Sequence, residues 1–562
     1  MSLISLFVSL ALSIPPCYSE EILVGPYLGE ATPASQWISW ETDSNDATDV
    51  SWGATRDLGH VTNGEAFVSR GKTKVHEARL SGLAPDTKYF YRVTTSDARS
   101  EIFSFRTPPL LEVKKPFRFF SFSDNHHERP EIGIFGSVIK SMEDAAKREG
   151  AVDIEDDVAL AINAGDMVGD EQKNGYGAYR TEYFKHAESL AARIPVYSVI
   201  GNHEQNSKSY FDYFHLPENA NSGLTWKRII GSKEYMKHWY SFQYSNVHFI
   251  GLDTNSGYRN DDQLKWLEED LKKQCSDPNT DFFVIYHHHP FESVLWPEGN
   301  TPWVGKVIGL MERYSDRCGK PAAQFSGHTH GYSKGQSPSA NLYLIDTAAS
   351  SGWLDTWGRY SGNNEQKNYK SFTKSIPEFG FLVMDVTTGP DAMIRFKRYT
   401  LGTEETLKHN REAGLPEYDL QDTFVLKKNN KPPLRPILGL LSGNCDFQAS
   451  AFNDPDGDAI LGTQWQVAQV PTDFEKPLID DLLYVEDWFN GDKTRPGFNP
   501  TDQVDLMKGI DITKWKIAMP LKAISRYYAR ARYRDSALAW SQWSDAYAFT
   551  TGETGRECVV VQ

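Results

Sequence analysis

The sequence lacks an apolar run long enough to cross a bilayer, which takes roughly 20 residues. The stretch from Leu3 to Ile14 is apolar but shorter than that, and the small Ser19 follows it. Residues 1–19 are therefore predicted to be a secretory signal peptide, although a charged n-region is missing. A lipoprotein signal ending at Cys17 is less favoured, because proline (Pro16) is a poor residue before a lipid-modified cysteine. A start-site artefact is the remaining alternative. The protein is predicted to be secreted, periplasmic or extracellular.

Positive charge is also in short supply. The chain has 59 Lys and Arg against 75 Asp and Glu, which gives a formal net charge of −16. Such a chain repels a polyanion, so binding of a nucleic-acid duplex is not expected. A local cationic metal site can still attract a single phosphate against this background. With 562 residues, 40% of them hydrophobic, the chain is predicted to fold into two to four domains.

Cysteine is rare, with five in the chain, and Cys17 would leave with the signal peptide. An even number then remains, which in an exported chain predicts disulfides with three possible pairings. Cys275 and Cys318 each end a predicted helix just before a strand, whereas Cys445 and Cys558 bracket the C-terminal segment. We therefore predict the pairs Cys275–Cys318 and Cys445–Cys558. Four free buried thiols are the alternative.

Residues 20–108 consist of short strand patterns without a helical period. Leu80 to Tyr89 resembles the tyrosine corner of a fibronectin type III sandwich, in which Tyr89 would bond back to the backbone near Leu83. Residues 116–400 instead alternate strands with helical stretches such as Ile134 to Arg148, which predicts βαβ units. A predicted hairpin and a terminal antiparallel pair in this segment indicate two mixed sheets flanked by helices.

After a predicted connector at residues 401–431, residues 432–551 are again all β, and residues 552–562 form a tail. One strand of this segment carries alternating arginines around Arg532, and Trp540 to Ser544 matches the Trp-Ser-x-Trp-Ser signature of fibronectin-type receptor domains. Interleaved Arg and Trp side chains predict a cation–π ladder. We interpret it as a structural brace, with contact to carbohydrate or another surface as the alternative. The predicted fold is an α/β sandwich between two fibronectin III-like sandwiches.

The middle segment carries five short motifs, each at the end of a predicted strand. Ligands collect beyond the carboxyl ends of strands in open α/β sheets. Each motif alone is weak evidence, because such residues also cap helices and form turns. Together, in one segment, they predict a polynuclear metal site. They are Asp124-Asn125-His126, Gly165-Asp166, Gly201-Asn202-His203-Glu204, His287-His288-His289-Pro290 and Gly327-His328-Thr329-His330.

These motifs resemble the blocks of the calcineurin-like metallophosphoesterase superfamily, and the β segment before them resembles that of purple acid phosphatases. The resemblance implies a secreted hydrolase of phosphoric esters with two divalent or trivalent ions (Fe, Mn or Zn) that activate a hydroxide. His203 would stabilise or protonate the leaving oxygen, with a structural hydrogen bond as the alternative. By the same resemblance, one ion would bind Asp124, His126 and His330, the other Asn202, His288 and His328, and Asp166 would bridge them.

The chain departs from the purple acid phosphatase pattern in two places. Gly169 stands where those enzymes carry the tyrosine that binds ferric iron, so the identity of the ions stays open. The loop from Phe291 to Glu298 lacks the histidine pair that plant members use on phosphomonoesters, so a phosphodiester substrate is as credible as a monoester. Trp353 and Trp357 are predicted substrate contacts, with core packing or a lid as the alternative.

A function from another class is also compatible with the sequence. The chain could be a non-catalytic exported binding or adhesion protein built on a retired metallophosphoesterase domain. Retired enzymes usually lose metal ligands, and this chain retains all seven residues that the resemblance assigns to the ions. Enzyme activity is therefore the favoured hypothesis.

Overall fold

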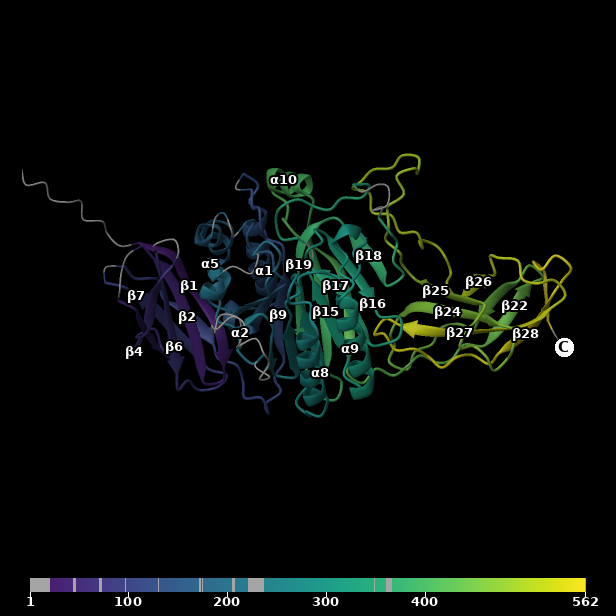
Figure 1. The fold of residues 1–562 in the computed structure, drawn as a ribbon, viewed down its shortest axis with the longest axis horizontal. Helices are drawn as coiled ribbons and strands as arrows, with labels where there is room; N and C mark the ends of the chain where they lie inside the picture. The colour runs from purple at the N-terminus through teal and green to yellow at the C-terminus, as the bar shows by residue number, and fades with distance from the viewer. Residues whose placement is uncertain are drawn as a thin grey trace, which may run out of the picture.

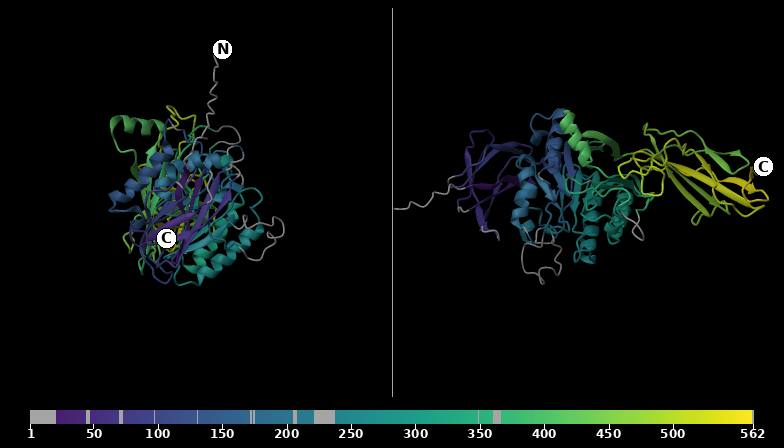
Figure 2. Two further views of the ribbon diagram at one scale, coloured as in Figure 1. Left: turned by 90° about the vertical axis from the view of Figure 1, so that its left-hand side faces the viewer. Right: turned by 90° about the horizontal axis from the view of Figure 1, so that it is seen from above.

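In the computed structural model, three groups of β-sheets follow one another along the long axis (Figure 1), and the further views show the same succession (Figure 2). The predicted signal peptide at residues 1–19 lies outside the described residues. No helix among those residues has the length and apolar character of a membrane span. The structure describes residues 21–43, 47–69, 73–96, 98–129, 131–170, 173, 175–204, 208–220, 237–347, 349–359 and 366–560.

The N-terminal part consists of two four-stranded antiparallel sheets with the strand orders β1-β2-β6-β5 and β4-β3-β7-β8. Trp40 of one sheet and Tyr91 of the other are fully buried in the core that the two sheets share. The backbone N–H of Ala84 donates to the hydroxyl oxygen of Tyr89 at 2.9 Å, as predicted for a tyrosine corner. The strands are β1 (Ile22–Thr32), β2 (Ser35–Thr42), β3 (Asp49–Gly53), β4 (His60–Asn63), β5 (Glu65–Val68), β6 (Lys74–Ser81), β7 (Lys88–Thr94) and β8 (Phe103–Arg106).

The central part has a six-stranded sheet, β11-β10-β9-β19-β20-β21, and a seven-stranded sheet, β12-β13-β14-β15-β17-β16-β18. Both mix parallel and antiparallel neighbours, which confirms the predicted mixed sheets. Phe119 of one sheet meets Phe249 of the other edge-on at 5.2 Å, so the sheets share a core. The strands are β9 (Phe117–Phe122), β10 (Val158–Asn163), β11 (Val196–Ser198), β12 (Tyr240–Tyr244), β13 (Val247–Gly251), β14 (Phe282–Tyr286), β15 (Ala322–Ser326), β16 (Tyr332–Gln336), β17 (Leu342–Thr347), β18 (Phe372–Ile376), β19 (Phe379–Val386), β20 (Met393–Gly402) and β21 (Asp419–Lys427).

Helices cover the outer faces of these sheets (Figure 1). The helices α8 and α9 bury Leu267 and Met311 against the seven-stranded sheet. The Asn260 side chain caps α8 by accepting from the N–H of Gln263 at 3.0 Å. The helices are α1 (Ile134–Arg148), α2 (Ile154–Asp157), α4 (Tyr176–Ala178), η1 (Tyr179–Phe184), α5 (Lys185–Ala191), α6 (Lys208–Tyr213), α8 (Asp261–Cys275), η3 (Pro297–Gly299), α9 (Val304–Cys318) and α10 (Glu404–Ala413).

Residues 401–431, predicted as a connector, instead contribute structure to the central part. They contain α10 and the strand β21, which pairs antiparallel with β20 at the edge of the six-stranded sheet. Along β21 only alternate residues such as Phe424 and Leu426 are buried. A strand with one solvated face has about as many polar as apolar residues. This composition resembles that of a linker, which is why the segment was predicted to be a connector.

The C-terminal part has a three-stranded sheet, β22-β23-β26, and a five-stranded sheet, β25-β24-β27-β28-β29. The indole rings of Trp465 and Trp515 stack at 5.5 Å between the two sheets. The strands are β22 (Leu438–Ser442), β23 (Asp446–Ala449), β24 (Ile460–Ala468), β25 (Ile479–Tyr484), β26 (Lys514–Lys516), β27 (Arg526–Asp535), β28 (Tyr547–Thr551) and β29 (Cys558–Val560).

The arginines of β27 interleave with two tryptophans, as the sequence predicts. The Arg530 guanidinium lies 4.0 Å from the Trp543 ring, and that of Arg532 lies 4.1 Å from the Trp540 ring. The next arginine, Arg534, is fully buried and donates to the carbonyl oxygen of Ala340 at 2.8 Å. Because Ala340 belongs to the turn between β16 and β17, the ladder also fastens the C-terminal sheets to the central part.

Both predicted disulfides are present, Cys275–Cys318 and Cys445–Cys558. The first joins the last residues of α8 and α9, which lie side by side on the seven-stranded sheet. The second joins the turn before β23 to β29 and so closes the C-terminal part. Its two cysteines are 113 residues apart, against 43 for the first pair.

We expect the double substitution Cys445→Ser with Cys558→Ser to lower the free energy of unfolding of the C-terminal part by about 5 kcal/mol. The reason is that a long cross-linked loop removes much conformational entropy from the unfolded chain. Urea unfolding under non-reducing conditions, followed by Trp fluorescence, measures the change. An unaltered transition would mean that this bond contributes nothing to stability.

Candidate metal centre

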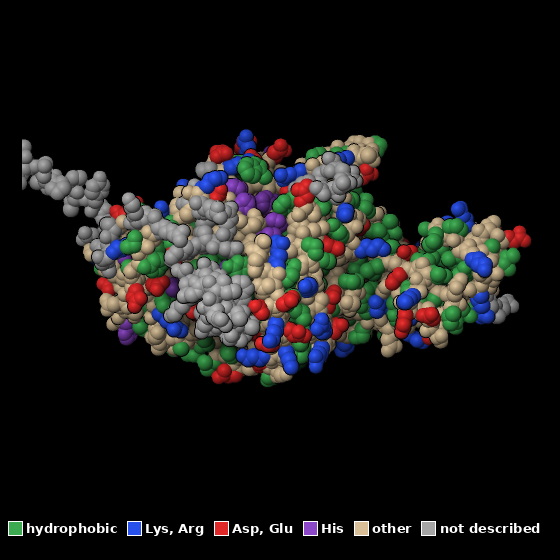
Figure 3. Space-filling view, viewed as in Figure 1, with side chains coloured by type: hydrophobic (Ala, Val, Ile, Leu, Met, Phe, Trp, Pro, Cys, Tyr) green, Lys and Arg blue, Asp and Glu red, His purple; other side chains and the backbone are tan. Residues whose placement is uncertain are grey.

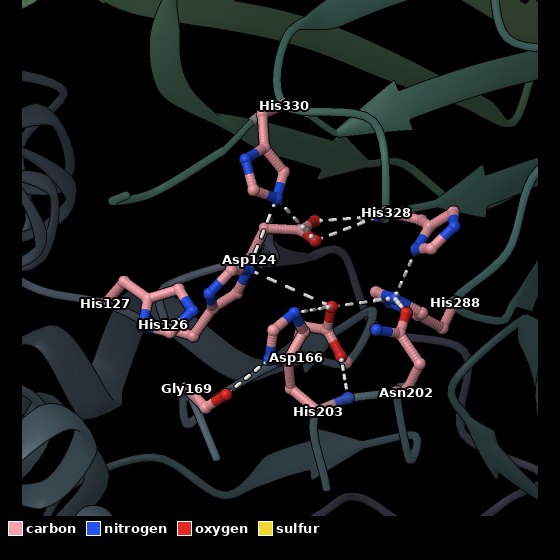
Figure 4. Close-up of polar contacts among 12 residues, drawn as sticks. Asp124, His126, His127, Asp166, Gly169, Asn202, His203, His288, His328 and His330 are labelled. Atoms are coloured by element: carbon pink, nitrogen blue, oxygen red, sulfur yellow. Dashed lines mark hydrogen bonds and ion pairs between the residues drawn. The ribbon is translucent and has the colours of Figure 1, made fainter. Parts of the chain in front are cut away.

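Loops from both central sheets meet at one place. The parallel neighbours β9, β10 and β11 bring Asp124, Asp166 and Asn202 to the carboxyl edge of one sheet. The parallel neighbours β14 and β15 bring His288 and His328 to the same edge of the other. Figure 4 shows these side chains directed toward one another. The N–H of His328 donates to the Asp124 carboxylate at 2.9 Å, which ties the two loop systems together.

The local backbone explains the glycines of these motifs. Asp124, Asp166 and His328 have φ values of 51°, 56° and 69°, in a region that residues with a side chain rarely adopt. A Cβ atom at Gly201 would lie 2.2 Å from Oδ1 of Asp166. A Cβ atom at Gly327 would lie 2.5 Å from Oδ2 of Asp124. Strained backbone held in this way is typical of functional sites.

One group of donor atoms surrounds Nε2 of His288. This nitrogen lies 3.0 Å from Oδ2 of Asp166, 2.9 Å from Oδ1 of Asn202 and 3.1 Å from Nδ1 of His328. The other ring nitrogen of His288 lies 2.9 Å from the carbonyl oxygen of Ala164 and donates to it. Nε2 is therefore the atom that faces the oxygen and nitrogen donors.

A second group lies on the other side of Asp166. Nε2 of His126 and Nε2 of His330 are 3.2 Å apart, and the latter is 3.7 Å from Oδ1 of Asp124. His330 is oriented by its Nδ1, which donates to the carbonyl oxygen of Trp353 at 2.6 Å. Burial and the neighbouring His330 hold the pKa of His126 well below its usual range, so its imidazole is neutral. Two imidazole nitrogens that face each other at this distance can bind one cation between them.

The charges in the site also favour a cation. Burial lowers the pKa of His288, but Asp166 and Asp124 outweigh burial and raise the pKa to about 9. Burial raises the pKa of Asp166, yet His288 holds it well below the usual range. The two carboxylates thus stabilise positive charge at this buried position, and a bound cation would supply that charge in place of the His288 proton. Imidazole, carboxylate and amide donors without cysteine suit Mn, Fe or Zn ions. The residues present therefore fit the two metal ions that the family resemblance implies.

Glu204 is a residue of this site that sequence reasoning missed. Its carboxylate accepts the backbone N–H groups of Gly201 at 2.6 Å, Asp166 at 3.0 Å and Met167 at 2.7 Å. Burial, followed by the nearby Asp166, raises its pKa to about 7. Glu204 thus joins the loop that carries Asp166 to the loop that carries Asn202. Its place at the end of the Gly-Asn-His-Glu motif was the only signal.

His203 lies beside the donors without belonging to either group. Its Nδ1 is 2.5 Å from the carbonyl oxygen of Gly169, and its backbone N–H donates to Oδ1 of Asp166 at 2.9 Å. The ring stacks on that of His126 with 4.2 Å between centroids. Since Nδ1 is engaged with the backbone, Nε2 is the ring atom left to meet a substrate, and the residue lines the cavity described next.

The side chain of His127 explains why Gly stands at position 169. A Cβ atom on Gly169 would lie 2.4 Å from Nδ1 of His127. The His127 backbone N–H and that of Gly169 both donate to Glu182, at 3.1 and 2.8 Å. The His127 ring therefore occupies the space that any side chain at residue 169, including a tyrosine, would need.

A cavity of about 270 Å³ opens above the donors. Histidine side chains gather in a hollow of the central part in the space-filling view (Figure 3). Trp353 is 57% exposed at its rim. Trp357 is only 2% exposed and packs edge-on against Phe489 at 5.3 Å. It is therefore a core residue, which was the alternative to a substrate contact. The lining residues are Asp166, Asn202, His203, Trp296, Glu298, His328, His330, Trp353, Asp355 and Arg359.

Comparisons with known proteins agree with this geometry. Residues 24–107 match the purple acid phosphatase N-terminal domain, and residues 117–332 match the calcineurin-like phosphoesterase family. Purple acid phosphatase 21 of Arabidopsis thaliana is 26% identical over 268 residues, which are 46% of this chain and 53% of that protein. Purple acid phosphatase 23 of the same plant is 26% identical over 366 residues, 55% of this chain and 73% of that protein.

The chain thus spans about half to three quarters of the length of these relatives. Among solved structures, purple acid phosphatase PPD1 from yellow lupin (Lupinus luteus) seeds has the same fold, with a TM-score of 0.51 at 15% identity. That match covers 72% of this chain and 74% of the lupin chain. Together with the five motifs and their convergence, residues 117–332 match the calcineurin-like phosphoesterase family, and the residues before them match the purple acid phosphatase N-terminal domain.

Proposed function

We propose that this protein is a secreted, binuclear metal-dependent phosphoesterase. The observation that carries the proposal is the double cluster of donors around Asp166. His288 Nε2 has three oxygen or nitrogen neighbours within 3.1 Å on one side, and the Nε2 atoms of His126 and His330 lie 3.2 Å apart on the other. A buried cluster of such oxygen and nitrogen donors is stabilised further when it binds a cation.

The first ion would be held by Asp124, His126 and His330, and the second by Asn202, His288 and His328, with Asp166 between them. When bound, two such ions supply positive charge to the phosphoryl oxygens and make a water molecule nucleophilic at neutral pH. The protein fixes the donors before the ions arrive, because backbone carbonyls orient the rings of His288 and His330.

His203 would serve the leaving group. Its Nδ1 is fixed by Gly169, so a proton on Nε2 can be delivered into the cavity toward the ester oxygen that departs. Oδ1 of Asp166 accepts the backbone N–H of the same residue, which fixes His203 relative to the carboxylate that would lie between the two ions. In this proposal, a proton donor and the centre that activates the nucleophile would act on one phosphorus atom.

Two further features support the remaining parts of the proposal. The disulfides favour an oxidising compartment and therefore export. In the C-terminal part, the N–H of Lys522 donates to the hydroxyl oxygen of Tyr527 at 3.1 Å, across the same five-residue interval as Ala84 and Tyr89. We infer that the C-terminal sheets form a fibronectin III-like sandwich whose role is to brace the central part.

Metal removal tests the proposed function. We expect the purified chain, loaded with Mn²⁺ or Zn²⁺, to hydrolyse p-nitrophenyl phosphate, bis-p-nitrophenyl phosphate or both. Chelation should lower the rate by at least roughly 10³-fold, because without the ions the pKa of water returns far above neutral pH, and added metal should restore the rate. Elemental analysis must accompany the assay. A chain that binds two ions and turns over neither ester would be the exported binding protein instead.

A further inference from the structure

Two indole rings flank the cavity, one beside each group of donors. Trp353 is tied to the first group, because its carbonyl oxygen accepts from Nδ1 of His330 at 2.6 Å. Trp296 is tied to the second group, because its ring lies 4.5 Å from the ring of His328. Both line the cavity that lies over Asp166. A phosphorus atom held between the two groups would therefore have an aromatic wall on either side.

The local packing holds both indoles in place. A Cβ atom at Gly299 would lie 3.0 Å from both the Trp296 ring and the His328 ring, so the chain passes close behind this indole. Trp353 lies 5.9 Å from the Arg129 guanidinium and 5.6 Å from the His127 ring, yet 57% of it is exposed. An indole that is supported from behind and open to the cavity can stack a flat group at little entropic cost.

The charge of the cavity points the same way. Arg359 is the only Lys or Arg among the described residues that line it. Its Nη1 lies 2.7 Å from Oδ1 of Asp355, so a carboxylate already offsets its charge. Asp355 is itself fixed, since its other oxygen accepts the N–H of His330 at 2.9 Å. The ion pair of Arg359 and Asp355 would attract a doubly charged phosphate only weakly. A singly charged phosphate needs less positive charge around it to bind.

We propose that the cavity selects monoanionic phosphodiesters that carry a flat aromatic or heteroaromatic group, with Trp353 and Trp296 as the residues that determine this specificity. The inference rests on the proposed function and names its substrate class. A diester has two organic substituents on phosphorus, one for each indole, and a single negative charge. A phosphomonoester has one substituent and, near neutral pH, two charges, so it would leave one indole unused.

The test uses the full chain loaded with Mn²⁺. We expect kcat/KM for bis-p-nitrophenyl phosphate to exceed that for p-nitrophenyl phosphate by at least about tenfold. Trp353→Ala should raise KM for the diester about tenfold, the size expected for loss of one stacking contact, with kcat changed less than about threefold. Trp353→Phe keeps a flat ring and should restore most of the affinity. Trp296→Ala provides an independent second test on the opposite wall.

A matched control is Trp52→Ala, because Trp52 also stacks on a histidine, His60 at 4.6 Å, but lies in the N-terminal sheets. It should leave both kinetic constants unchanged. Metal content is measured for every variant, since a purely structural role of Trp353 would lower metal content and kcat instead of raising KM. A wild-type preference for the monoester, or an unchanged KM in Trp353→Ala, would overturn the inference. Absence of turnover of both esters by the loaded wild type would overturn the proposed function itself.

Discussion

Asp166→Ala should lose metal and hydrolysis together. Asp166 stands between the two donor groups, with Oδ2 3.0 Å from Nε2 of His288 and 3.9 Å from Nε2 of His126. Removing this carboxylate takes a ligand from both proposed ions at once and leaves the imidazoles to repel each other. We expect metal content to fall from about two ions per chain to less than about one, and kcat/KM to fall by at least roughly 10³-fold. Elemental analysis and ester hydrolysis measure the two effects.

The control for this substitution is a buried aspartate that belongs to neither donor group. Asp346 of β17 is 1% exposed, accepts from the Ser326 hydroxyl at 2.5 Å, and has its pKa raised to about 7 by burial. Asp346→Asn keeps the shape of the side chain and one oxygen that can accept from Ser326, so metal content and rate should stay near those of the wild type. If Asp166→Ala retained two ions and full activity, the bridging role would be refuted. Loss of metal in both variants would indicate a general effect on folding.

Much of the fold could be predicted because its signals are local. The helical pattern predicted the stretch from Ile134 to Arg148, which is α1, and the turn at Ser245 and Asn246 predicted the hairpin of β12 and β13. The disulfide pairing followed from two cysteines at helix ends before neighbouring strands. The motifs at strand ends indicated convergence, because parallel strands present their carboxyl ends at one edge.

The parts that the sequence did not reveal depend on contacts between distant residues. Glu204 acts by bonding a loop 38 residues away, at Asp166, and a motif alone does not show that bond. Trp353 and Trp357 looked equivalent in the sequence. The structure separates them because Phe489, far along the chain, covers Trp357. Similarly, β21 could only be recognised as a strand once β20 was available to pair with it.

His203→Ala should retain both ions and slow turnover by about 10²–10⁴-fold, the range for general acid catalysis. The imidazole is not a member of either donor group, since its Nε2 lies 3.9 Å from Oδ2 of Asp166 and its Nδ1 is bound to Gly169. Metal content should therefore be unaffected. The measurement is kcat with the metal-loaded variant, compared at saturating substrate with the wild type.

The leaving group decides between an acid and a structural role for His203. p-Nitrophenolate departs readily without a proton, whereas an alkoxide needs one, so a lost general acid slows alkyl esters much more than p-nitrophenyl esters. A structural role would act through the bonds of His203 to Gly169 and Asp166 and would slow both kinds of ester by the same factor. We expect the unequal loss, because the backbone already occupies Nδ1 and only Nε2 remains to meet the departing oxygen.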